Sequence, residues 1–251
     1  MCTLFIYRNK LSDWPLLIAT NRDEQLNRKF YAPSFHWKGF PNIFAGKDLL
    51  KGGSWLGINK NGLCVAILNR EGLITNNPGI VSRGNLVIEA LKYSTAKEAS
   101  YVIFKKLENF YNNFNLFIGD NTSAYWIKYH NEKKLIKPIP YGHSMIDKHD
   151  LNDSSSNKQK IYSKIFKSLE IPNPEKNNFK DWKNMLKMKI RYKNFKNTEV
   201  YIDDLKKNYG TVCSSIIGMP KTYNKNKKAF WLYSDRLDRS KRFLFLSPFQ
   251  R

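Results

Sequence analysis

The stretch Cys2-Thr3-Leu4-Phe5-Ile6-Tyr7 places a thiol at the second position of the chain, directly before an apolar, strand-like run. Removal of Met1, which a small second residue permits, would make Cys2 the N-terminus. One residue would then carry a thiol and an α-amine, with reference pKa values of about 8.5 and about 7.7–8.0. Such an amine can activate its own nucleophile. A buried, inert cysteine at the start of a strand is the alternative.

Length and composition indicate a folded protein. The chain has 251 residues, of which 41% are hydrophobic, and we expect one domain over residues 1–251. It has no apolar run of about 18 residues, so the sequence predicts no transmembrane segment. It has no basic leader before an apolar stretch, so we expect a cytoplasmic protein. The three cysteines are widely spaced, which predicts neither a disulfide framework nor a metal site.

The net charge of +22 is the largest compositional bias. A basic surface attracts nucleic acids and anionic membranes. However, the lysines are spread along the chain among many asparagines, and no nucleic-acid-binding motif is present. We therefore expect no specific nucleic-acid partner, and steering of anionic small molecules is the alternative role for the charge. The sequence leaves the oligomeric state open.

Apolar patterns predict alternating blocks of strands and helices, which is typical of an α+β fold. A polar loop is expected at 27–42, and Asn61-Gly62 predicts a type I′ hairpin turn. The helical region is expected to break near Ser94, with a capping box that starts at Thr95. Strands are expected at 2–8, 16–20, 55–58, 63–68, 116–118, 124–127, 135–136, 211–217 and 229–233, and helices at 83–107, 158–169 and 177–191.

Six short motifs follow one another along the chain and resemble those of one family. Asn21-Arg22-Asp23-Glu24, with Cys2 ahead of it, resembles the signature of the NRDE family, also called the transport and Golgi organisation protein 2 family. The further matching segments are Gly52-Gly53-Ser54-Trp55-Leu56-Gly57, Asn69-Arg70, Ser82-Arg83-Gly84, Leu151-Asn152-Asp153 and Tyr209-Gly210-Thr211. The resemblance therefore spans nearly the whole chain.

This resemblance implies a fold and a chemistry. The family is similar to N-terminal-nucleophile hydrolases, especially the cysteine branch that acts on non-peptide C–N amide bonds. The implied architecture is a four-layer αββα sandwich, and the implied function is Cys2-dependent hydrolysis of such a bond in a small molecule. Members are also linked to haem trafficking. The alternative is a non-catalytic carrier or chaperone for haem or an acylated metabolite, with haem as transported ligand and no resident cofactor.

The resemblance also assigns roles to residues near the first two strands. Cys2 would be the nucleophile, forming a thioester that water hydrolyses. Arg22 and Asp23 are adjacent, so they should face opposite sides of a strand. A carboxylate at Asp23 can orient the α-ammonium, and the Arg22 guanidinium can hold the thiolate or a substrate carboxylate. Exposed ion pairs in this tetrapeptide are the alternative.

Further site residues are expected where strands end. Asn69 follows an apolar strand, and its amide can donate to a developing oxyanion. Asn152 would be a second amide donor by resemblance to the family's late asparagine. Both are equally compatible with asparagines in turns. Asn21, Trp55 and Arg70 are expected to bind substrate, because aromatic and polar side chains line small-molecule sites.

One departure from the family pattern affects function. The family's late G-T-R segment reads Gly210-Thr211-Val212-Cys213 here, so the arginine is absent. If that arginine completes a hydrolytic site, its absence favours the carrier over the hydrolase. Cys213 is expected to be a buried strand residue.

Overall fold

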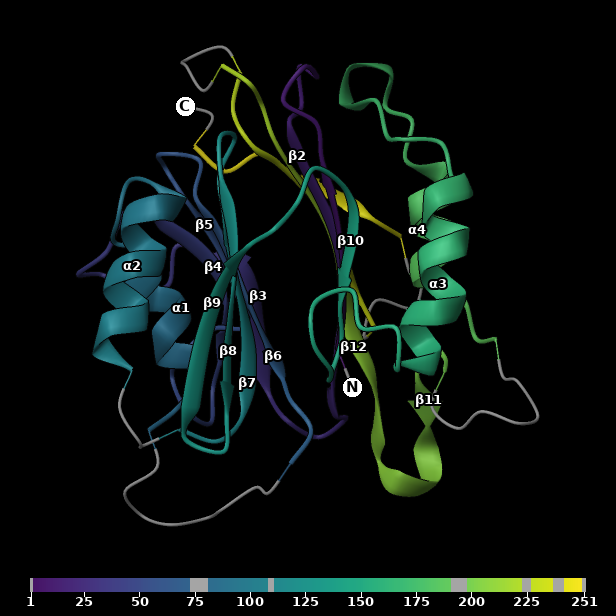
Figure 1. The fold of residues 1–251 in the computed structure, drawn as a ribbon, viewed down its shortest axis with the longest axis horizontal. Helices are drawn as coiled ribbons and strands as arrows, with labels where there is room; N and C mark the ends of the chain where they lie inside the picture. Colours follow the sequence, from purple (N-terminus) through teal and green to yellow (C-terminus); the bar gives the residue numbers. More distant parts are fainter. Residues whose placement is uncertain are drawn as a thin grey trace.

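In the computed structural model, residues 2–72, 81–107, 111–190, 198–222, 227–236 and 242–249 are described. In these segments the strands form two seven-stranded antiparallel sheets that stack face to face. One pair of helices covers the outside of each sheet (Figure 1). The four layers confirm the predicted αββα sandwich.

The first sheet carries the chain's N-terminal segment in its interior. Its strand order is β10-β1-β2-β12-β13-β14, and β11 pairs with β12. The first hairpin, predicted from the apolar runs before residue 21, pairs Thr3 with Asn21. The strands are β1 (Thr3–Arg8), β2 (Leu16–Gln25), β10 (Gly142–Ile146), β11 (Asp203–Asp204), β12 (Tyr209–Met219), β13 (Phe230–Asp235) and β14 (Leu244–Leu246).

The second sheet is a meander in sequence order, from β3 to β9. Most neighbours are joined by short connections, which favour this arrangement, but β6 and β7 are joined through the helical region 83–107. The Asn61-Gly62 hairpin joins β5 to β6 as predicted, but of these two residues only Gly62 has a positive φ, of 86°. The strands are β3 (Phe30–Ser34), β4 (Ile43–Asp48), β5 (Leu56–Asn59), β6 (Cys64–Asn69), β7 (Phe114–Gly119), β8 (Ala124–His130) and β9 (Lys133–Pro138).

Two helix pairs form the outer layers. Residues 83–107 contain two helices as predicted, and the Thr95 side chain accepts a hydrogen bond from Glu98 N at the second start. The helices are α1 (Gly84–Ala90) and α2 (Ala96–Lys106) on the second sheet, and α3 (Asn157–Ser168) and α4 (Lys180–Leu186) on the first, with 3₁₀ turns η1 (Pro174–Lys176) and η2 (Leu205–Lys207). None of the helices in the described segments has the length and apolarity needed to cross a membrane.

Side-chain alternation along β1 distributes apolar residues between two cores. Leu4 and Ile6 belong to the core between the sheets, whereas Phe5 packs beneath α3 and α4. A third core lies between the second sheet and α1 and α2. Because successive side chains of a strand point to opposite faces, Cys2 shares the inter-sheet face with Leu4, and it packs against that core.

Several expected boundaries need correction. The segment 27–42 is not all loop, because it contains the edge strand β3, whose sequence Phe-Tyr-Ala-Pro-Ser has no alternation of apolar and polar residues. The helix expected at 177–191 is shorter and spans Lys180–Leu186. Strands β4, β10, β11 and β14 were not predicted either. Strands β10 and β14 lie at the edges of the first sheet, where pairing with a neighbour replaces a strong apolar pattern, and β11 has only two residues.

Asn59 holds the β5–β6 hairpin against the helical layer. Its Nδ2 donates to Leu91 O and Tyr93 O at 2.8 and 2.7 Å. Its Oδ1 accepts from the backbone N–H groups of Asn61 and Leu63, both at 3.0 Å. The side chain is buried, and so are its partners Leu91 and Leu63.

Asn59→Ala should therefore lower the free energy of unfolding by about 2 kcal/mol or more, since unsatisfied buried polar groups cost about 1–3 kcal/mol. Chemical denaturation measures the change. The matched control is Asn61→Ala, an exposed side chain on the same hairpin, for which the change should stay below about 0.5 kcal/mol. Equal losses in both variants would show that the Asn59 side chain does not hold this contact.

Candidate active site

Cys2 lies directly before β1, beside the Asn21-Arg22-Asp23-Glu24 segment of β2. Its Sγ accepts a hydrogen bond from Asp23 N at 3.3 Å and lies 3.7 Å from Asp23 O. The residue is partly buried. Burial and the Asp23 carboxylate raise the pKa of the Cys2 thiol, and the Arg22 cation acts in the opposite direction. The predicted nucleophile is therefore held by the backbone of the predicted orienting residue.

Asp23 is fixed by the neighbouring strand β12. Thr211 Oγ1 donates to Asp23 Oδ1 at 2.6 Å and itself accepts from Ile202 N at 2.9 Å. Asp23 is only 2% exposed. Its carboxylate therefore lies on the helix-facing side of the sheet, while its backbone contacts the thiol, which agrees with the opposite facing predicted for Arg22 and Asp23.

Arg22 points between the two sheets, on the face that Cys2 occupies. Its Nη2 donates to Asp48 Oδ2 at 3.0 Å, and the guanidinium carbon lies 4.2 Å from the centre of the Trp55 ring. Phe30 packs edge-on against Trp55 at 5.5 Å. The Nη1 atom is buried and has no hydrogen-bond partner among the described residues. Arg22 thus offers a shielded donor beside the thiol.

The position of Trp55 depends on a glycine in the adjacent strand. A Cβ atom built on Gly46 would lie 2.3 Å from the Trp55 ring. Only glycine therefore leaves room for the indole to stack on Arg22. Trp55 thus contacts Arg22 through this stacking and also packs against the inter-sheet core.

Acidic partners hold the arginines at this end of the sandwich. Arg28 donates to both carboxylate oxygens of Asp48, at 2.7 and 3.1 Å, and its Nη1 lies 3.7 Å from Glu24. Burial would raise the pKa of Asp48, but the hydrogen bond from Arg28 and the charge of Arg22 keep it below its usual value. Asp48 therefore stays ionised and fixes the Arg22 side chain.

Arg83 is a further cation near Cys2, and sequence reasoning gave it no role. Its charge interacts with those of Cys2 and Glu24, and its Nη1 donates to Asn113 O at 2.8 Å. Burial lowers the pKa of Arg83. The start of α1, which follows Arg83, is held against the segment before β5, because Ser54 N donates to Gly84 O at 3.1 Å. The Ser82-Arg83-Gly84 motif is the signal that points to this residue.

Tyr209 is a second residue that the sequence did not single out for the site. Its hydroxyl donates to Asp23 O at 3.2 Å, the same carbonyl that Cys2 Sγ approaches. Burial and the negative charges of Cys2 and Asp23 raise the pKa of Tyr209. The phenol therefore remains a proton donor throughout the physiological range.

A β-bulge lies at Val212, the position where the resemblance to the family pattern places an arginine. Thr211 pairs with Asp23 and Cys213 pairs with Arg22, so Val212 is an extra residue in β12. A bulge redirects side chains, and both Val212 and Cys213 enter the core between the sheets. Burial raises the pKa of Cys213 to about 12, and it is a buried strand residue as predicted.

Two other predicted site residues make contacts away from the thiol. Asn21 is fully buried on the helix-facing side, where Nδ2 donates to Leu186 O and Val200 O at 2.8 and 2.9 Å. Its Oδ1 accepts from Ser214 at 2.7 Å. Arg70 donates to Asn115 Oδ1 at 3.1 Å and forms a close ion pair with the Asp150 carboxylate. The Asn21 bonds thus tie β2 to the end of α4, and the Arg70 contacts tie the end of β6 to β7 and to the segment around Asp150.

Of the two expected oxyanion donors, Asn69 lies at a strand end as predicted, whereas Asn152 lies in a turn after β10. Asn69 ends β6 one residue after Leu68, which belongs to the inter-sheet core, so alternation directs Asn69 toward the helix-facing side of its sheet. Asn152 has a positive φ of 54° and bonds to the edge of β10. Its Oδ1 accepts from Met145 N at 2.8 Å, and its Nδ2 donates to Ser144 Oγ at 3.2 Å.

Comparison with sequence families and relatives gives a consistent result. The model of the family described as Transport and Golgi organisation 2 matches residues 1–228. An uncharacterized protein of Saccharomyces cerevisiae is 35% identical over 134 residues, which is 48% of this chain and 42% of that protein. A Transport and Golgi organization protein 2 homolog of Bos taurus is 32% identical over 142 residues, 51% of this chain and 49% of the relative. The chain thus spans about half the length of these relatives.

Solved structures share the fold at low sequence identity. Penicillin V acylase from Agrobacterium tumefaciens superposes with a TM-score of 0.59 and 12% identity, over 98% of this chain and 86% of that chain. The N-acylethanolamine-hydrolyzing acid amidase ortholog of Caenorhabditis elegans gives 0.57 and 13%, over 86% and 92%. A mutant of the conjugated bile acid hydrolase from Clostridium perfringens gives 0.57 and 12%, over 100% and 93%. The fold is that of N-terminal-nucleophile hydrolases.

The electrostatics around Cys2 can be tested by alkylation. Because the Asp23 carboxylate raises the pKa of the thiol, Asp23→Asn should lower the pH midpoint for iodoacetamide labelling of Cys2 and speed labelling severalfold at neutral pH. Asparagine keeps an acceptor for Thr211, so the strand contact survives. Peptide mass spectrometry separates Cys2 from the buried Cys64 and Cys213. Asp13→Asn, on an exposed turn, should leave the midpoint unchanged. A midpoint that rises in Asp23→Asn contradicts the assignment.

Proposed function

Because this chain belongs to the Transport and Golgi organisation 2 family, we propose that it hydrolyses a non-peptide C–N amide bond of a small molecule, with Cys2 as nucleophile. One observation carries the proposal. Cys2 Sγ is held at 3.3 Å by Asp23 N, next to an arginine with a buried, unpartnered Nη1 among the described residues. A half-buried thiol and a shielded cationic donor on one face suit attack on a carbonyl.

The chemistry begins with removal of Met1, which converts Cys2 N into an α-amine. The amine takes the thiol proton, and Sγ attacks the amide carbon to form a tetrahedral oxyanion. The C–N bond then breaks as the leaving amine takes a proton, and a thioester remains. Water attacks the thioester, the C–S bond breaks, and the released acid leaves Cys2 as a thiol again.

Residues on both faces of β2 would assist these steps. Arg22 Nη1 is placed to donate to the oxyanion or to a substrate carboxylate, and the Trp55 ring keeps its guanidinium in position. The Tyr209 hydroxyl donates to Asp23 O and so helps to hold the backbone segment that contacts the thiol. The Asp23 carboxylate lies within electrostatic reach of the thiol and can orient the α-ammonium. Asn69 and Asn152 remain proposed oxyanion donors on the resemblance alone.

Cys2→Ala should abolish turnover of an acyl-amide panel that includes N-acylethanolamines, conjugated bile acids and penicillin V. These substrate classes are chosen because the solved structures that share this fold are named for acting on them. Liquid chromatography with mass detection measures the released amine. Cys213→Ala, which alters a buried cysteine of the same core, should keep turnover within about threefold. Equal turnover in wild type and Cys2→Ala would remove Cys2 from the chemistry.

A carrier without turnover is a second candidate, and one observation favours it. Val212 fills the position of the family's late arginine and is buried in the inter-sheet core, so this cation is absent from the site. If the protein carries haem, haemin titration should produce a saturable shift of the Soret band, and no released amine should appear with any amide. An unchanged Soret band at micromolar protein contradicts the haem version.

A further inference from the structure

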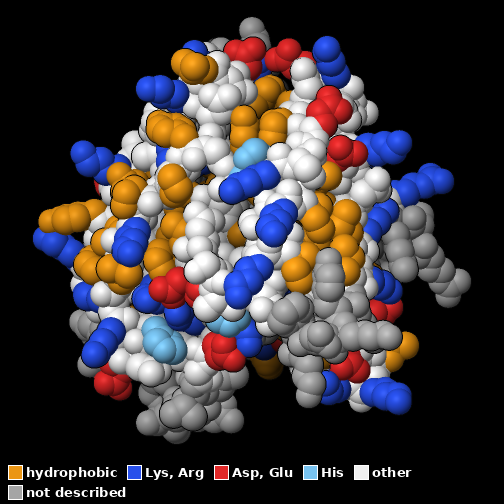
Figure 2. All heavy atoms as spheres, turned by 45° about the vertical axis from the view of Figure 1, so that its right-hand side comes forward, with side chains coloured by type: hydrophobic (Ala, Val, Ile, Leu, Met, Phe, Trp, Pro, Cys, Tyr) orange, Lys and Arg blue, Asp and Glu red, His pale blue; other side chains and the backbone are white. Residues whose placement is uncertain are grey.

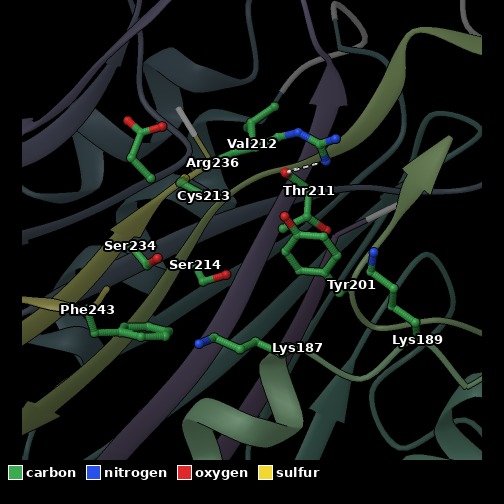
Figure 3. A pocket seen from close by; sticks show the side chains of 11 residues that line it. Lys187, Lys189, Tyr201, Thr211, Val212, Cys213, Ser214, Ser234, Arg236 and Phe243 are labelled. Carbon is green, nitrogen blue, oxygen red and sulfur yellow. Dashed lines mark hydrogen bonds between the residues drawn. The ribbon is translucent and has the colours of Figure 1, made fainter. Parts of the chain in front are cut away.

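A pocket lies on the helix-facing side of the first sheet, across the sheet from the Cys2 thiol. It has a volume of about 130 Å³ and opens between the end of α4, β12 and β13. Figure 3 shows its side chains, with Lys187 extending toward the Phe243 ring and the hydroxyls of Ser214 and Ser234 nearby. Ser214 and Ser234 are paired across β12 and β13, so they form part of its floor.

The side chains around this pocket include more cations than acids. Lys189 and Arg236 share a single carboxylate, Asp203, and together they hold its pKa at about 2. Lys187 makes no ion pair with any residue in the described segments; its ammonium lies 5.9 Å from the Phe243 ring centre. Among the described residues, Asp235 is the one acid that lines the pocket.

Lys183 increases this imbalance. It lies one helical turn before Lys187, and its ammonium is 5.7 Å from the same Phe243 ring. Like charges four residues apart destabilise a helix, and burial together with the charge of Lys187 lowers the pKa of Lys183. An anion bound at Lys187 would reduce this repulsion, because it would offset the charge of one of the two neighbouring cations.

The remaining groups define the shape of a suitable ligand. Ser234 makes no side-chain hydrogen bond with another described residue, so its hydroxyl can donate. Ser214 donates to Asn21 Oδ1 at 2.7 Å, and its oxygen can only accept from a ligand. The Phe243 ring supplies an apolar wall beside the Lys187 ammonium.

We propose that this pocket binds a small molecule in which a phosphate or carboxylate group is attached to an aromatic body. The oxyanion contacts Lys187 and Ser234, and the aromatic part packs against Phe243. The site is separate from the proposed catalytic centre, although Thr211 belongs to both: it lines the pocket and donates to Asp23. Binding here does not require that Cys2 be catalytic.

Isothermal titration calorimetry with phenyl phosphate at fixed ionic strength tests the proposal. Phenyl phosphate should bind more tightly than inorganic phosphate, because only the former can pack on Phe243. Lys187→Gln should weaken binding about tenfold, as expected for loss of a charged hydrogen bond, and Ser234→Ala should weaken it severalfold. Benzoate in a parallel titration distinguishes a carboxylate ligand from a phosphate ligand.

The control variant is Lys60→Gln, which removes an exposed lysine from a turn of the other sheet, and it should bind like wild type. Cys2→Ala should also bind like wild type, which separates this site from the proposed hydrolysis. The proposal is overturned if Lys187→Gln binds phenyl phosphate as tightly as wild type. It is also overturned if Lys60→Gln weakens binding equally, because the attraction would then come from net charge alone.

Discussion

The hydrogen bond from Thr211 to Asp23 is the contact on which the arrangement of the site depends. It ties β12 to β2 at the point where β2 passes Cys2, and its length of 2.6 Å fixes the carboxylate on the helix-facing side. Asp23 therefore presents its backbone N–H to the thiol. Because Asp23 is held, its neighbour Arg22 must point between the sheets, where Asp48 and Trp55 receive it.

This division by faces gives the first sheet two chemical environments. The inner face holds a thiol, a guanidinium and aromatic rings within an apolar core. The outer face carries carboxylate, amide and hydroxyl groups beneath α3 and α4, and further along it lies the pocket around Lys187. Figure 2 shows that Lys and Arg side chains are spread over much of one face of the molecule. The net charge of +22 is therefore less informative about function than a buried cation such as Arg22.

Local patterns predicted the parts of the site that are close in sequence. Alternation along one strand correctly separated Arg22 from Asp23, and the apolar run after Cys2 placed the thiol at the start of β1. Arg83 and Tyr209 could not be found in this way, since packing of distant segments brings them to the thiol. The bulge at Val212 was also hidden, because an extra residue leaves no mark on an apolar strand. The edge strand β3 was missed because its exposed side chains lack a period.

The account as a whole requires a thiol and an α-amine on the same residue, within the site that Arg22 and Asp23 form. Condensation with 2-cyanobenzothiazole tests this most directly, because the reagent closes a ring only with a cysteine that carries both groups. The account predicts one adduct per chain, located at Cys2, together with an intact mass that lacks Met1. A mature chain that retains Met1 and forms no adduct would contradict it.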